Sequence, residues 1–72
     1  MSNVGKMLHN RRKELGFTLE TVGKQVGVGK SLVCKWEKGV VKNMRCNNLV
    51  AVARVLHIDP VDIFKAILLD HK

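Results

Sequence analysis

The residues that most often carry catalysis or bind metals are present in this chain, but not in the groupings that such chemistry requires. His9, His57 and His71 have no cysteine or carboxylate partner at metal-ligand spacing. Cys34 and Cys46 are too few for a disulfide framework, and they do not form a CxxC pair. No nucleophile–base set and no phosphate-binding loop can be identified. The sequence therefore predicts a protein that is not an enzyme and that needs no metal and no cofactor.

Charge is more informative than these residues, because it is unevenly distributed along the chain. The formal net charge is +7. Residues 1–45 contain ten Lys or Arg and three Glu, whereas residues 46–72 contain three basic and three acidic residues. One cationic half in a small domain indicates a polyanionic partner. The alternative is that the excess charge covers all faces and only maintains solubility.

The length of 72 residues allows one domain, over residues 1–72, near the lower limit for an unaided hydrophobic core. Such a core has no room for a deep substrate cleft, so we expect no small-molecule substrate. No apolar run approaches the roughly 18 residues of a membrane span, and the N-terminal residues lack the apolar block of a signal peptide. We therefore expect a protein of the reducing cytoplasm that does not contact a membrane.

Apolar residues recur at helical spacing along the chain, and no stretch alternates as a strand would. Thr18 is a typical N-cap, and Asp59 followed by Pro60 is a strong start signal for a helix. Gly16 follows the last apolar residue of the first helical segment, as a left-handed cap would. Four of the five expected helices lie at about 3–15, 19–26, 30–38 and 60–69. The remaining helix follows a loop that ends at about residue 46, and it extends to about residue 56.

Residues 18–38 combine the features that two helices need in order to cross closely through a short turn. Such a crossing requires a small residue at the contact, a residue with positive φ in the turn, and a shared apolar core. Gly23 and Gly27 supply the first two. The apolar positions are Val22, Val26, Val28, Val33 and Trp36. Each feature alone is common, but their combination within a basic domain predicts a helix-turn-helix.

Three segments around this motif carry a resemblance to a known family. They are Leu15-Gly16-Phe17-Thr18, Lys35-Trp36-Glu37-Lys38-Gly39, and the spaced residues Leu49, Ala53, Leu56, Ile58, Asp59 and Pro60. Over roughly residues 4–68 the chain resembles the Cro/CI-type (Xre-like) helix-turn-helix family of phage repressors and small bacterial regulators. The resemblance implies an all-α, compact five-helix, lambda-repressor-like domain. Its third helix would enter the major groove of double-stranded DNA, usually as a dimer on a two-fold operator.

In this family the first turn and outer face of the third helix contact base edges, and the matching residues here are Lys30, Ser31 and Lys35. Lysine can donate to O6 and N7 of guanine, and serine can donate or accept. Cys34 lies on the same outer face, where its thiol either contacts a thymine methyl or is simply tolerated. The alternative for Lys30 and Lys35 is contact with phosphates. We therefore expect these four residues to lie in the major groove and to contact base edges there.

Phosphate contacts would fix the register of the protein on DNA. The resemblance implies one such contact just after the Thr18 cap, where the family often has Gln. Here that position is Leu19, which leaves only backbone N–H groups as donors. The resemblance also pairs Arg12 with Glu37 in a structural ion pair, from which Arg12 would still lean on the DNA backbone. Further candidates flank the third helix on its C-terminal side: Lys38, Lys42, Asn43 and Arg45.

The last helical segment has more apolar residues than one face can use, since residues 63–69 contain six apolar side chains among seven. Phe64 and Leu68, with Ile67, are expected to dock on the core. The opposite face would then point partly elsewhere, which predicts a symmetric homodimer. The alternative is that the first and fourth helices cover both faces. The expected interface residues are Ile63, Ala66, Ile67 and Leu69.

These expectations favour a sequence-specific, nucleoid-associated transcriptional regulator, a repressor or Cro-like protein that acts by occupying an operator. A second hypothesis is the DNA-binding antitoxin of a toxin–antitoxin pair, for which the chain leaves little tail to hold a toxin. A third is a protein-interaction module on the same fold, which the uneven charge argues against.

Overall fold

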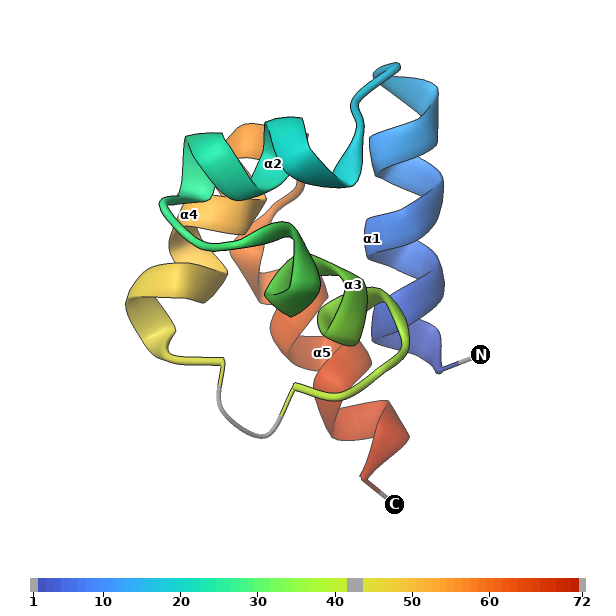
Figure 1. The fold of residues 1–72 in the computed structure, drawn as a ribbon. Helices are drawn as coiled ribbons and strands as arrows, with labels where there is room; N and C mark the ends of the chain where they lie inside the picture. The colour runs from blue at the N-terminus through green and yellow to red at the C-terminus, as the bar shows by residue number, and fades with distance from the viewer. Residues whose placement is uncertain (1, 42–43, 72) are drawn as a thin grey trace.

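The fold is known from a computed structural model that describes residues 2–41 and 44–71 (Figure 1). In this part of the chain the protein forms five α-helices and no strand. They are α1 (Asn3–Glu14), α2 (Leu19–Val26), α3 (Lys30–Glu37), α4 (Cys46–Leu56) and α5 (Pro60–Asp70). The predicted all-α, five-helix architecture is therefore confirmed. None of these helices has the length and apolarity to span a bilayer.

The helix ends follow from local chemistry that the sequence displays. Thr18 caps α2 by accepting a hydrogen bond from the Thr21 amide at 3.0 Å. Asp59 caps α5, whose first residue is Pro60. Gly29, at the start of α3, offers no side-chain cap, as its lack of a side chain requires. These ends lie within a residue or two of the predicted positions.

One hydrophobic core joins all five helices. α1 packs against α5 and α3, while α2 packs against α3 and α4 (Figure 1). Six large side chains are fully buried: Trp36, Leu56, Ile63, Val4, Val22 and Val52. Because Trp36 comes from α3, the core holds the inner face of that helix and leaves the opposite face to solvent.

The orientation of α5 differs from the prediction. Ile63 and Ala66 are 0% and 3% exposed, whereas Phe64 and Leu68 are 54% and 55% exposed. Ile63 and Ala66 thus lie in the core, which corrects their assignment to a dimer interface, whereas Leu69 is 52% exposed as expected. With apolar residues on almost every side of the helix, apolar spacing alone does not define its inner face.

A carboxylate at the end of α5 contributes to this orientation together with the burial of Ile63 and Ala66. Asp70 accepts hydrogen bonds from the backbone N–H groups of Asn3 at 2.8 Å and Val4 at 3.0 Å, and so caps the start of α1. Ile63 and Ala66 lie seven and four residues before Asp70, on the same side of the helix. When Asp70 faces α1, these two side chains face the core.

The Asp70 cap makes stability depend on pH. The hydrogen bond from the Val4 backbone, supported by the one from Asn3, lowers the pKa of Asp70 below its usual value of 3.8. A lowered folded-state pKa gives stability that is present above the unfolded value and is lost as pH falls through the folded value. Denaturation by urea should show wild type more stable than Asp70→Ala at pH 6, with the difference shrinking below about pH 3.8.

A difference between wild type and Asp70→Ala that stayed constant from pH 6 into strong acid would contradict the charged cap. It would show that the side chain contributes only through packing or through neutral hydrogen bonds.

Candidate nucleic-acid interface

The crossing of α2 and α3 has the geometry that the sequence predicted. A Cβ atom at Gly23 would lie 2.8 Å from the carbonyl oxygen of Val28, so the backbone of the turn passes directly over this residue. Gly27 ends α2 with a φ of 92°, in the left-handed region that favours glycine. Val22 and Val33 are buried beneath the crossing. Residues 18–38 therefore form a helix-turn-helix.

The four candidate base-contacting residues lie together on the outer side of α3. Lys30, Ser31 and Lys35 are exposed, and Cys34 is half-buried beside them. Their spacing of i, i+1, i+4 and i+5 puts the four residues on one side of the helix, which we call the α3 face. The structure brings the predicted residues together on a solvent-accessible surface, and their contact with bases stays a prediction.

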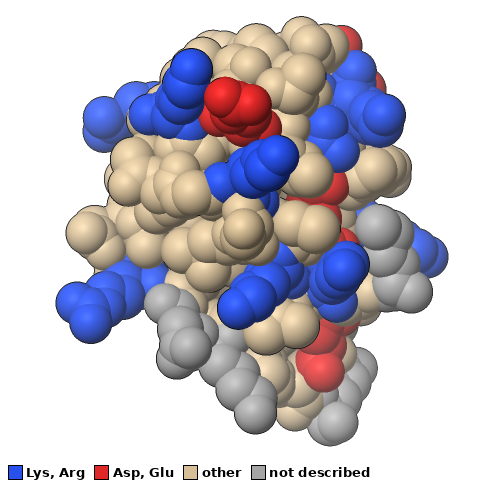
Figure 2. Space-filling view, viewed as in Figure 1, with Lys and Arg blue, Asp and Glu red and all other residues tan. Residues whose placement is uncertain are grey.

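The α3 face is basic, and no acid on α3 opposes it. The helix has a single acidic residue, Glu37, which is buried. Lys38 follows it at the C-cap and is exposed. Figure 2, viewed with α3 toward the reader, shows several Lys and Arg side chains across this side of the molecule and fewer acidic ones. Such a surface attracts a polyanion.

Glu37 is neutralised by Arg12 of α1. The guanidinium donates from Nε to Oε2 at 2.6 Å and from Nη2 to Oε1 at 3.1 Å, and both side chains are more than nine-tenths buried. Its Nη1 donates to the carbonyl oxygen of Phe17 at 2.9 Å. The expected structural ion pair is confirmed. The nitrogen atoms Nε, Nη1 and Nη2 of Arg12 already donate to acceptors within the protein. Contact between Arg12 and the DNA backbone stays a prediction.

Two residues of α1 that help to hold α3 were missed at the sequence level. His9 places Nδ1 2.8 Å from Oε1 of Glu37, although the two residues are 28 positions apart. A Cβ at Gly5 would collide with the backbone oxygen of Glu37. Their positions give a signal in retrospect: Gly5 and His9 precede Arg12 by seven and three residues and share its face.

The phosphate-contact candidates divide into three groups. Thr18 is exposed at the start of α2, whereas Leu19 is half-buried and packs on the core, so its backbone rather than its side chain is available there. Lys38 and Arg45 are exposed on either side of the α3–α4 connection. Lys42 and Asn43 lie outside the described residues. All of these contacts stay predictions.

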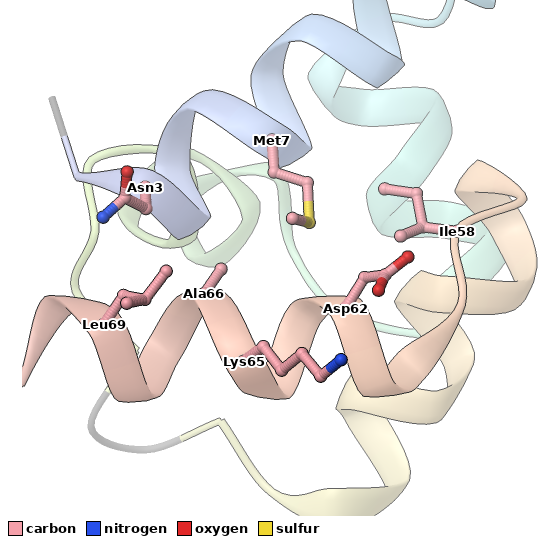
Figure 3. Close-up of a pocket in the computed structure, with 7 residues that line it drawn as sticks. All are labelled: Asn3, Met7, Ile58, Asp62, Lys65, Ala66 and Leu69. Atoms are coloured by element: carbon pink, nitrogen blue, oxygen red, sulfur yellow. The ribbon is translucent and has the colours of Figure 1, made fainter.

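The rest of the described surface has fewer features of a binding site than the α3 face. A groove of about 500 Å³ lies between α1 and α5, lined by apolar residues that include Met7, Ala66 and Leu69 and by the polar residues Asn3, Asp62 and Lys65 (Figure 3). Within the described residues, no three His, Cys, Asp or Glu side chains lie close enough to hold a metal ion. Cys34 and Cys46 are both free thiols.

Residues 8–63 match a protein family described as helix-turn-helix, and the match covers more than half of the chain. The chain belongs to this family, which is the Cro/CI type that the sequence resembles. Membership makes it a DNA-binding regulator of the helix-turn-helix class. Comparison with curated proteins and with solved structures gave no match.

Proposed function

We propose that this protein is a sequence-specific transcriptional regulator, a repressor or Cro-like protein that occupies a two-fold DNA operator. The observation that carries the proposal is the α3 face, where Lys30, Ser31, Cys34 and Lys35 project together from a helix whose only acid is buried. A protein of this kind performs no chemistry and needs no cofactor. It would act in the cytoplasm, on the nucleoid.

Specificity would come from donors, because the α3 face carries no carboxylate and no amide side chain. Asn and Gln are the usual partners of adenine, whereas Lys pairs with O6 and N7 of guanine. We therefore expect Lys30 and Lys35 to select guanines within each half-site. Backbone N–H groups at the start of α2 and the side chains of Lys38 and Arg45 would hold phosphates.

A homodimer would match the symmetry of such an operator. The apolar surface available for it on α5 consists of Val61, Phe64 and Leu68, which are each more than half exposed and follow one another at i, i+3 and i+7. Of the residues expected from the sequence, Leu69 is exposed and Ile67 is half-buried. On a two-fold operator with half-sites one turn of DNA apart, a symmetric dimer has to hold its two α3 helices about 34 Å apart.

The base-reading role of Lys35 predicts a loss of preference rather than a uniform loss of affinity. The best site is first selected from random duplexes. At one base position of that site, Lys35→Ala should reduce the free-energy difference between binding the preferred base and binding another base by about 1–3 kcal/mol. Lys38→Ala is the matched control, since removal of a phosphate contact should weaken binding to all sequences alike. Equal binding of specific and random duplexes by wild type at physiological salt would contradict the proposed function.

The dimer predicts cooperative binding to a duplex with two half-sites one turn apart. Wild type should sediment with this duplex as two 8.1 kDa chains per site. Phe64→Glu/Leu68→Glu should bind each half-site independently, because a charge on the apolar face opposes its burial. As a control, Val50→Glu places one carboxylate on an exposed valine of α4, away from α5, and should leave cooperativity intact. A double variant as cooperative as wild type would exclude this interface.

A further inference from the structure

A second basic surface lies beside α3, on α1. Lys6 and Lys13 are seven residues apart, with His9 between them, so the three share one side of the helix. We call Lys6 and Lys13 the α1 edge. The hydrogen bond of 2.8 Å between His9 and Glu37, the last residue of α3, places this side of α1 next to the C-terminal end of α3.

Within residues 2–41 and 44–71, the α1 edge has no acidic partner in an ion pair. Lys6 and Lys13 are exposed, and neither forms an ion pair with any residue that the structure describes. The carboxylate of Glu14 lies 3.4 Å from Arg11, and that of Glu37 is occupied by Arg12. In Figure 2, basic side chains extend beyond the centre of the view to the right, where Figure 1 places α1.

The basic neighbours of α1 differ from the edge in what they do. Arg11 donates from Nε to the carbonyl oxygen of Leu56 at 2.9 Å and so ties α1 to the end of α4. Arg12 is buried against Glu37. Structural contacts therefore account for Arg11 and Arg12, whereas the side chains of Lys6 and Lys13 make no ion pair with the residues that the structure describes. Their charges are available to an external anion.

We propose that the α1 edge binds backbone phosphates of the DNA that α3 enters, an inference that rests on the proposed function. Phosphates line both walls of the major groove, so cations beside an inserted helix meet them. A lysine ammonium on a flexible stem is a point charge suited to a phosphate oxygen. The contact of His9 with Glu37 is one of the contacts that hold the α1 edge beside α3, together with the Arg12–Glu37 ion pair.

Salt dependence tests this inference. Each neutralised phosphate contributes a slope of roughly −0.9 to log K against log salt concentration. Lys6→Gln/Lys13→Gln should therefore make the slope shallower by about 1.8 and weaken binding to specific and random duplexes by the same factor. Glutamine favours helix about as well as lysine, so thermal unfolding should be unchanged.

The matched control is Arg54→Gln/Lys65→Gln, which removes the same charge from exposed positions on α4 and α5. Its slope should stay near that of wild type. If wild type binds DNA and both double variants keep the wild-type slope, or lose it equally, the α1 edge has no phosphate contact. If wild type does not bind DNA at all, the proposed function fails with it.

Discussion

The position of α3 depends on the buried ion pair between Arg12 and Glu37. One guanidinium holds both carboxylate oxygens, at 2.6 and 3.1 Å, and the carbonyl oxygen of Phe17 at 2.9 Å. It thereby joins α1, the connection to α2 and the end of α3. A buried charge left without its partner costs about 3–5 kcal/mol, a large share of the stability of a small domain. The pair also removes the only acid of α3 from the surface, which leaves the α3 face cationic.

Glycines make this arrangement sterically possible. At Gly23 the turn after α2 comes within 2.8 Å of where a Cβ would be, and at Gly5 the end of α3 occupies the corresponding space over α1. α3 is thus approached by backbone at both ends, while Trp36 anchors its middle in the core. A helix of eight residues is marginal by itself. These tertiary contacts give it one orientation, and a reading helix requires one orientation.

Local features allowed much of the fold to be predicted from sequence. The Thr18 cap, the Asp59-Pro60 start and the small residue at Gly23 each act within a few residues, so the helices and the crossing of α2 and α3 could be located. The face of α5 could not, because its orientation depends on contacts with residues far away in the chain, such as the hydrogen bonds that Asp70 accepts from the backbone N–H groups of Asn3 and Val4. The His9–Glu37 contact was missed for the same reason. Helical spacing sufficed to gather Lys30, Ser31 and Lys35 on one face, whereas spacing carries no information about which bases they meet.

The most direct test of the central claim, that the ion pair locks α3 onto α1, is a double-mutant cycle followed by urea unfolding. Arg12→Met and Glu37→Met should each cost about 3–5 kcal/mol, because each removes the bidentate partner of a buried charge. Only His9 then remains beside Glu37, or the carbonyl oxygen of Phe17 beside Arg12. The double variant should lose far less than the sum, because a pair of apolar side chains replaces a pair of charges. Losses that simply add would contradict the account, because they would show that Arg12 and Glu37 stabilise the fold independently and not as a pair.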